Sequence, residues 1–144
     1  MTTLVRQMLA GKSEVYTVLP DSTVFDALRL MAEKNVGAVL VLHGKELVGI
    51  LSERDYARKM VLHGKNSRET YVREIMTDDV VSVPPSWTCG ECMALMTERH
   101  VRHLPVLEDE QLVGVISIGD VVRAIVQEQQ FTISNLESYI MSGG

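Results

Sequence analysis

The sequence has no long apolar run and no excess of basic residues, and each absence excludes a class of partner. No apolar stretch approaches the roughly 20 residues that span a bilayer, so we expect no membrane association. Fourteen Lys and Arg stand against nineteen Asp and Glu, which gives a net charge of −5. Because affinity for nucleic acid comes mainly from basic side chains on phosphates, we expect no nucleic-acid partner.

Cysteine is also scarce, and no export signal precedes it. Two cysteines without an apolar signal segment near the N-terminus indicate free thiols in a reducing cytoplasm. The sequence contains no Ser-His-Asp order and no phosphate-binding glycine loop, so we expect no enzyme. The 46% apolar and 23% charged residues of this 144-residue chain are typical of one folded globular domain.

What the sequence does contain is an internal duplication. Residues 15–58 align with residues 80–123 without a gap, and 16 of the 44 aligned pairs are identical. Chance at ordinary composition would give roughly three. The segments that precede the repeats, 5–9 and 72–76, also match. A repeated unit this short usually buries its apolar face against its twin, so we expect one body with pseudo-twofold symmetry and two related clefts.

Each repeat is predicted to fold in the order β-α-β-β-α. In the first repeat, the pattern predicts strands at 15–18, 37–42 and 47–51, with helices that begin at Thr23 and Ser52. This order, repeated, indicates an α+β fold in which helices pack on small mixed sheets. We divide the chain into a leader (1–14), a first repeat (15–63), a linker with a second leader (64–79), a second repeat (80–127) and a C-terminal helix with its tail (128–144).

The C-terminal helix carries a group of apolar residues that we interpret as one stripe: Phe131, Ile133, Leu136 and Ile140. Such a stripe needs a cover, either the body of the same chain or a second subunit. We expect a homodimer in which this helix packs against the partner subunit.

Two strings at the fixed offset, GILSERD (49–55) and GVISIGD (114–120), resemble the signature of the cystathionine β-synthase (CBS) domain pair. The strings VREIMT (72–77) and RHLPVLED (102–109) add to the resemblance, which covers residues from about 5 to 125 and is closest to small stand-alone bacterial CBS-pair proteins. The resemblance implies that an adenine nucleotide (AMP, ADP, ATP or NAD) binds in the clefts between the repeats, without catalysis or a catalytic cofactor. It also implies a regulated protein target, whose identity the sequence does not reveal.

The Ser-x-x-Asp motif of each repeat has two interpretations. Ser52 with Asp55, and Ser117 with Asp120, form the pattern of a helix capping box. A strand that ends at a helix N-terminus also offers free N–H groups to an anion, and an Asp there can accept hydrogen bonds from a ribose diol. By the resemblance, the two Asp residues bind ribose and the two Ser residues contact ribose or phosphate. The two interpretations are compatible, since a carboxylate has two oxygens.

The resemblance also names residues for the phosphates and for the base. Arg102 and His103 occupy the place that reaches toward phosphates, and the first repeat has Gly37 and Ala38 there. Arg54 lies between Ser and Asp of the first motif, where the second has Gly119. Arg58 and Arg123, one turn beyond each Asp, could add positive charge. The adenine base is expected against apolar side chains and backbone of the first two strands of each repeat: Thr17, Val18, Ala38 and Val39, with Ser82, Val83, His103 and Leu104.

Two other classes of function stay open. Cys89 and Cys92 form a CxxC at a helix N-terminus, the setting of reactive thiols, and His100 and His103 extend it to a possible zinc set. The repeat alignment places the two cysteines on Val24 and Ala27, which favours small apolar core positions instead. A third interpretation is a structural adaptor whose clefts stay empty.

Overall fold

The computed structural model describes residues 2–11 and 15–142, and the chain divides into two compact bodies. The repeat-1 body comprises residues 14–81 with 110–112. The repeat-2 body comprises residues 1–13, 82–109 and 113–144. None of the helices in the described ranges combines the length and the hydropathy of a membrane-spanning segment.

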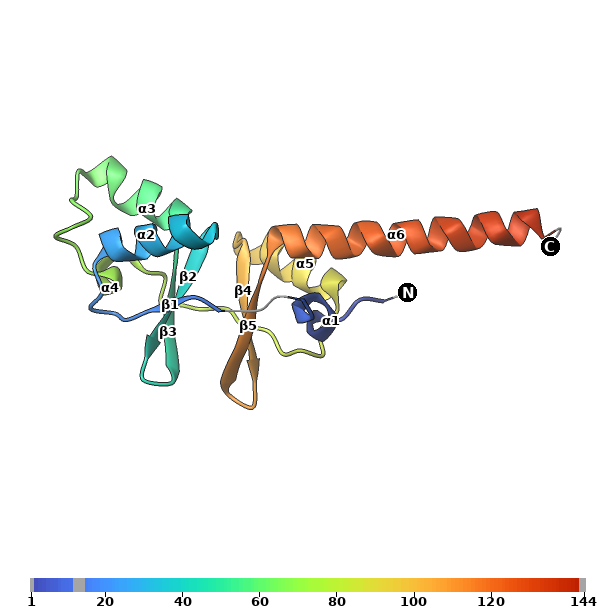
Figure 1. Ribbon diagram of the computed structural model, residues 1–144, viewed down its shortest axis with the longest axis horizontal. Coiled ribbons are helices and arrows are strands. Elements are labelled where there is room, and N and C mark those ends of the chain that lie inside the picture. The colour runs from blue at the N-terminus through green and yellow to red at the C-terminus, as the bar shows by residue number, and fades with distance from the viewer. Residues whose placement is uncertain (1, 12–14, 143–144) are drawn as a thin grey trace. The chain divides into compact units, whose positions relative to one another are not determined.

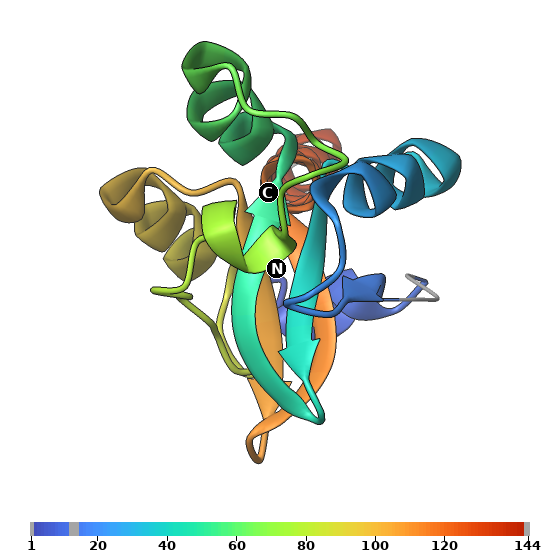
Figure 2. The same ribbon diagram turned by 90° about the vertical axis from the view of Figure 1, so that its left-hand side faces the viewer.

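The repeat-1 body contains a three-stranded sheet in the order β1-β2-β3 (Figure 1). Strands β1 and β2 run parallel and β2 and β3 form an antiparallel hairpin, in which Gly44 takes a φ of +63° in the turn. The elements in chain order are β1 (Thr17–Val18), α2 (Val24–Lys34), β2 (Ala38–His43), β3 (Glu46–Ser52), α3 (Glu53–Lys59), η1 (Val61–His63) and α4 (Val72–Ile75). Figure 2 shows α2 and α3 at the end of the hairpin that lies opposite its turn.

The repeat-2 body contains a two-stranded sheet, β4-β5. The strand predicted before the second repeat's first helix is reduced to one parallel bridge between Val83 and Val106. Pro105 takes the place of Leu40, whose N–H donates to the carbonyl of Tyr16 in the first repeat. Since proline has no N–H, the second repeat loses this ladder bond. The elements of this body are α1 (Val5–Leu9), α5 (Cys89–Arg99), β4 (His103–Glu108), β5 (Gln111–Ser117) and α6 (Ile118–Met141).

The leaders are exchanged between the repeats. Helix α4, which precedes the second repeat in sequence, packs in the repeat-1 body: Val72 and Ile75 are buried in its core, and Ile50 and Thr77 exchange two backbone hydrogen bonds. Helix α1, which precedes the first repeat, packs in the repeat-2 body instead. There the amide of Val5 donates to the carbonyl of Trp87 over 2.7 Å. Each body is therefore one repeat completed by the leader of the other.

The exchanged leaders explain the paired glycines of the two strings. A Cβ on Gly49 would lie 2.5 Å from Sδ of Met76 and 3.2 Å from the carbonyl oxygen of Thr77. A Cβ on Gly114 would lie 2.6 Å from Cδ2 of Leu9. In both bodies, the leader approaches β3 or β5 so closely that a side chain on either glycine would require Met76 or Leu9 to move.

The C-terminal part of the chain corrects two details of the sequence analysis. Residues 118–141 form one continuous helix, α6, and no connection separates a final helix at 128. No glycine or proline follows Gly119 within it, and Gln and Glu favour its continuation. Along a helix, residues two apart lie about 200° apart. Phe131 therefore points away from the face that holds Ile133, Leu136 and Ile140, and the four do not form one stripe.

Candidate functional site

The Ser-x-x-Asp motif of the first repeat is a capping box at the junction of β3 and α3. The hydroxyl of Ser52 accepts a hydrogen bond from the amide of Asp55 over 3.2 Å. In return, Oδ2 of Asp55 accepts from the backbone N–H of Ser52 at 2.9 Å and from its hydroxyl at 3.1 Å. The capping prediction is confirmed, and the box fixes the direction of the Asp55 side chain.

The other oxygen of Asp55 is held by groups that the sequence analysis did not identify. Oδ1 accepts a hydrogen bond from the hydroxyl of Thr77 at 3.2 Å and lies 3.2 Å from Nζ of Lys59. The same Lys59 ammonium donates to the carbonyl of Ile75 at 3.0 Å. The side chain of Asp55 is only 14% exposed, so this nearly buried carboxylate is matched by a cation and by hydroxyl and amide donors.

The motif of the second repeat has the same box but a different second partner. Oδ2 of Asp120 accepts from the amide of Ser117 at 2.8 Å, and the hydroxyl of Ser117 accepts from the amide of Asp120 at 3.2 Å. Oδ1 lies 2.6 Å from Nη2 of Arg123. The Asp120 side chain is 11% exposed, whereas Arg123 is 69% exposed. In the first repeat the cation is Lys59 rather than Arg58, whose side chain is exposed.

The first repeat brings most of its predicted ligand residues to one end of its sheet. Ala38 pairs with Ser52 across the hairpin, and Thr17 pairs with Leu40 two residues further along β2. Val39 is 1% exposed, and its side chain belongs to the core. Val18 is half-buried and packs against that core. Thr17, Ala38 and the box around Ser52 therefore form the accessible part of this end.

The second repeat repeats this geometry. The amide of Ile118 donates to the carbonyl of Arg102 at 2.9 Å, as the amide of Glu53 does to the carbonyl of Gly37 at 3.0 Å. Arg102 has an exposed side chain beside the start of α6, and His103 follows it at the start of β4. Val83 and Leu104 are almost fully buried, so only their backbone can face a ligand, and Ser82 is exposed. In the first repeat, Arg54 is half-buried in the first turn of α3.

The CxxC pair has the character of core residues rather than of reactive thiols. Cys89 is 1% exposed and Cys92 is fully buried, and both are free. Burial raises the pKa of Cys89 to about 11, and the hydrogen bond that its Sγ makes with the Glu128 carboxylate adds to the rise. Burial, chiefly, raises the pKa of Cys92 to about 11 as well. Reactive thiols need a lowered pKa, so a redox role for this pair is disfavoured.

The zinc interpretation of the same region has no geometric basis. His100 is the C-cap of α5 with a φ of +55°, the counterpart of Asn35, which caps α2 at +54°. The repeat thus uses His100 as a helix terminus. Across the described ranges, no group of three or more His, Cys, Asp and Glu side chains is arranged to hold a metal ion.

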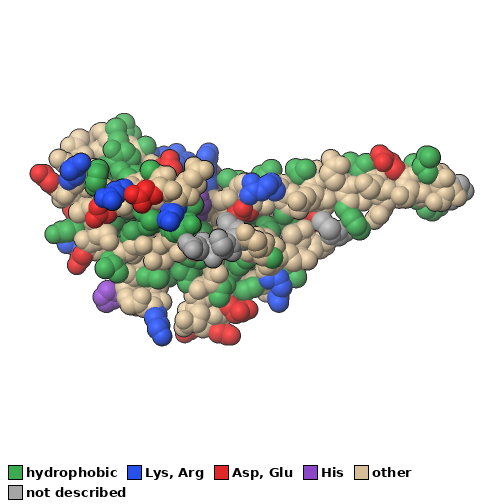
Figure 3. Space-filling model, in the orientation of Figure 1, with side chains coloured by type: hydrophobic (Ala, Val, Ile, Leu, Met, Phe, Trp, Pro, Cys, Tyr) green, Lys and Arg blue, Asp and Glu red, His purple; other side chains and the backbone are tan. Residues whose placement is uncertain are grey.

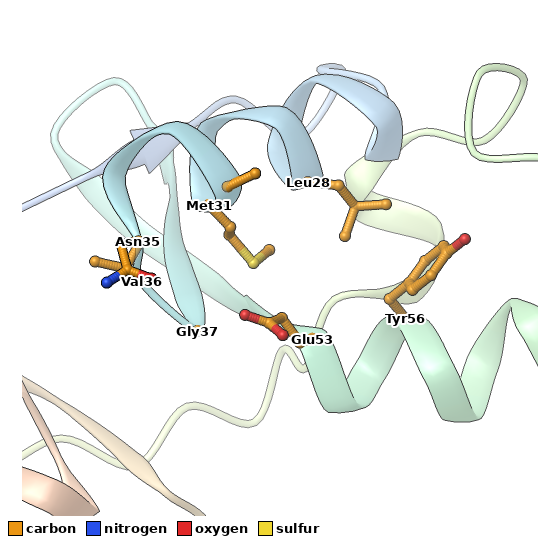
Figure 4. Close-up of a pocket in the computed structure, with 8 residues that line it drawn as sticks. Leu28, Met31, Asn35, Val36, Gly37, Glu53 and Tyr56 are labelled. Carbon is orange, nitrogen blue, oxygen red and sulfur yellow. The ribbon is translucent and has the colours of Figure 1, made fainter.

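A hollow of about 570 Å³ opens between α2 and α3 in the repeat-1 body (Figure 4). Leu28 and Met31 point from α2 toward Glu53 and Tyr56 on α3. This hollow was not predicted from the sequence, although the repeat alignment carries a signal for it. Glu53 and Tyr56 align with Ile118 and Val121, and Val121 is fully buried where α5 packs on α6. The hollow does not include Asp55 among its lining residues.

Thr77 and Lys59 are the residues that the sequence analysis missed at the first motif. Thr77 belongs to the VREIMT string, but its distance of 22 residues from Asp55 hides the contact. At the offset of the two leaders, Thr77 aligns with Ala10, which has no hydroxyl. The two motifs therefore differ in how firmly the rest of the body holds their Asp.

Comparison with known proteins identifies the family. The CBS domain model matches residues 5–62 and 72–127. An Arabidopsis thaliana protein, the mitochondrial CBS domain-containing protein CBSX3, is 42% identical over 128 residues, which cover 85% of this chain and 62% of that protein. The chain thus spans less than two thirds of the length of this relative.

Solved structures agree with the family match. A protein with CBS domains from Burkholderia ambifaria, described as a candidate signal-transduction protein, superposes with a TM-score of 0.85 at 52% identity, over 91% of this chain and 99% of that one. A CBS-domain protein from Agrobacterium tumefaciens gives a TM-score of 0.80 at 36% identity, over 85% and 98%. With two matched repeats, two Ser-x-x-Asp boxes and this fold, the chain belongs to the CBS domain family and carries a tandem CBS pair.

Proposed function

We propose that this protein is a regulatory CBS pair that binds adenine nucleotides (AMP, ADP, ATP or NAD) and catalyses no reaction of them. The observation that carries the proposal is the pair of nearly buried carboxylates, Asp55 and Asp120, each held at a helix N-terminus by its capping box. The resemblance to CBS pairs supports the ligand class. The proposal includes a cytoplasmic homodimer that signals to a protein target.

Each carboxylate has the chemistry that a ribose diol needs. Two hydroxyls of the ribose would donate to Oδ1 of the Asp, which is the oxygen outside the capping bond from the Ser amide. At Asp120 the diol has to compete with Arg123, which is mostly exposed and can swing away at little cost. At Asp55 it competes with Thr77 and Lys59. We therefore infer that the second motif admits a ligand more easily than the first.

Phosphates are assigned to basic side chains near the second motif. Arg102 lies exposed beside the N-terminus of α6, and Arg123 lies one turn into the same helix. A guanidinium offers a planar pair of donors to phosphate oxygens, and the helix N-terminus adds a favourable dipole. In the first repeat, Arg54 stands at the corresponding helix start.

A panel of ligands tests the proposal. Adenosine, AMP, ADP, ATP and NAD are added separately to the purified chain at about 100 times their Kd, where one bound ligand adds about 2.7 kcal/mol to stability. We expect a rise in melting temperature with adenine nucleotides and none with GMP or CMP. Isothermal titration calorimetry then gives the number of sites. If no adenine nucleotide raises the melting temperature and none produces heat, the ligand class is wrong.

The thiol alternative has no observation in its favour. Both cysteines are buried with raised pKa values, so neither supplies the thiolate that exchange chemistry requires. Titration of thiols with Ellman's reagent under native conditions separates this alternative from the nucleotide proposal.

A further inference from the structure

Helix α6 has a face that the repeat-2 body uses and a second face that it does not use. Val121 and Ala124 are 0% and 3% exposed and pack into the body, and Glu128 accepts a hydrogen bond from the amide of Thr3 at 2.6 Å. Beyond residue 128 the helix continues for more than three turns with exposed side chains throughout. Figure 3 shows hydrophobic side chains along this outer part.

The second face follows the spacing of a coiled coil. It consists of six residues at alternating steps of four and three, which we call the seam: Val122, Val126, Gln129, Ile133, Leu136 and Ile140. The five apolar members are 44–70% exposed. Steps of four and three repeat every seven residues, the period with which one helix packs along another. A helix that only covers its own domain has no need of this period at its free end.

We propose that the seam pairs with the seam of a second copy of this chain, in an antiparallel two-helix coiled coil centred near residue 131. The inference rests on the homodimer of the proposed function and names its contact. In this alignment, Val122 faces Ile140 of the second copy and Val126 faces its Leu136. Gln129 faces Ile133 of the second copy near the twofold axis, and no seam residue is left without a counterpart.

The charges beside the seam favour this direction. Arg123 and Glu137 each follow a seam residue, so both lie along the same edge of it. In an antiparallel pair, residues along this edge meet one another, which brings Arg123 of each copy beside Glu137 of the other. In a parallel pair they lie two heptads apart and cannot meet. In the antiparallel direction, the positive end of each helix dipole also lies beside the negative end of the other, which is favourable.

The seam is short, but the helix that carries it is already held by the repeat-2 body. It spans 19 residues, from 122 to 140, which is short for a free coiled coil. Here the helix is already formed, because Val121, Ala124 and Glu128 fix its first three turns to the body. Pairing therefore has no nucleation cost, and a self-complementary seam closes as a symmetric dimer.

Ile133→Asp and Phe131→Asp provide a matched test. Ile133 and Phe131 are 48% and 47% exposed and lie on opposite sides of the same helix. Sedimentation equilibrium of the full chain should show a dimer, with a Kd that rises at least about 100-fold for Ile133→Asp and less than about threefold for Phe131→Asp. Equal effects of the two variants, or a fully dimeric Ile133→Asp, would overturn the seam. Far-UV circular dichroism checks that both variants stay helical.

Charge reversal tests the direction. Glu137→Arg should raise the dimer Kd by about fivefold at low salt, and Arg123→Glu added to it should bring the Kd back toward the parent value. Because Arg123 also pairs with Asp120 of its own chain, circular dichroism checks that the double variant stays helical. If Glu137→Arg changes nothing, the antiparallel arrangement is wrong. Calorimetry with AMP on Ile133→Asp keeps the two proposals apart. Binding by a monomeric variant sustains the nucleotide proposal, while a parent chain that is monomeric at ~100 μM but binds AMP overturns the seam alone.

Discussion

The hydroxyl of Thr77 donates a hydrogen bond to Oδ1 of Asp55 over 3.2 Å, although 22 residues separate the two in sequence. Thr77 ends the leader that is exchanged onto the repeat-1 body, and its backbone pairs with Ile50. The leader is thus bonded directly to the carboxylate that we assign to ribose. A ribose bound as proposed would compete with this leader for the same oxygen atom of Asp55.

We expect Thr77→Val to destabilise the protein by about 1–2 kcal/mol, because a hydrogen bond to a charged acceptor is lost at a half-buried site. Urea unfolding measures this free energy. Thr97→Val is the control, since the exposed Thr97 hydroxyl donates to a carbonyl of its own helix, and we expect a change within about 0.5 kcal/mol. Equal costs for the two variants would mean that the Asp55 contact adds nothing.

The second prediction concerns ribose recognition. Asp55→Asn combined with Asp120→Asn should abolish nucleotide binding in calorimetry: with the amide oxygen in the capping bond, an NH2 donor replaces the carboxylate oxygen that would accept from the diol. Asparagine keeps one acceptor for the capping bond, but Asp55→Asn also loses the partners Thr77 and Lys59, so we expect a stability cost of about 1–3 kcal/mol per substitution and check by circular dichroism that the variant is folded. Glu53→Gln, a neighbouring carboxylate outside the box, should bind like the parent. Parent-like affinity in the double variant would refute the assignment.

Phosphate recognition gives the third prediction. Arg102→Ala should weaken AMP binding by about 1.5–3 kcal/mol, the range for charge-assisted hydrogen bonds, and should leave adenosine binding nearly unchanged. Arg99→Ala, on the last turn of α5, serves as the control for loss of one positive charge. Calorimetry with both ligands measures the difference. Equal losses for AMP and adenosine would show that Arg102 acts through the fold.

The fourth prediction follows from the close approach of the leaders. Gly49→Ala should cost about 1–3 kcal/mol in urea unfolding, since a Cβ there meets Met76 and the backbone of Thr77. Gly114→Ala should cost less, because the flexible end of Leu9 can move aside. Gly90→Ala should instead stabilise the protein. Gly90 lies in α5, where an added Cβ would be 3.9 Å from Oγ1 of Thr88, and alanine favours a helix over glycine by about 1 kcal/mol.

The thiols give a prediction about pH. A folded pKa of about 11, above the ordinary 9.0, means that the unfolded chain loses these protons first. The protonated thiols therefore contribute stability that is complete below pH 9 and is lost as the pH rises toward 11. The variant Cys89→Val with Cys92→Ala carries the residues of the first repeat and should lose less stability over this range. Identical pH dependence in urea unfolding would show that the thiols do not contribute.

Much of the local structure could be predicted from the sequence because it depends on neighbouring residues. The two Ser-x-x-Asp boxes join residues three apart, and the structure contains both bonds of each box. The placement of Cys89 and Cys92 in the core also followed from the alignment with Val24 and Ala27, since twin repeats have equivalent core positions. The ribose role of the two Asp residues stays a prediction.

The interpretation of residues 128–144 as a separate helix was wrong for a physical reason. An apolar group late in the chain suggested a new element, but helix propensity continues unbroken from Ile118 to Met141. Once the helix is continuous, its phase is set by Val121 and Ala124 in the core. The separation of Phe131 from Ile133 did not need the tertiary structure, because residues two apart lie about 200° apart in any helix.

The duplication, the helix starts and the family could be predicted from the amino-acid sequence, because these depend on local patterns that a repeat displays twice. Which leader completes which repeat could be known only from the three-dimensional fold. Segments 5–9 and 72–76 match so closely that either could pack beneath either glycine by pattern alone. The choice rests on contacts between residues far apart in sequence, such as Thr77 with Asp55 and Val5 with Trp87. Such contacts arise from the path of the whole chain, and no local pattern encodes them.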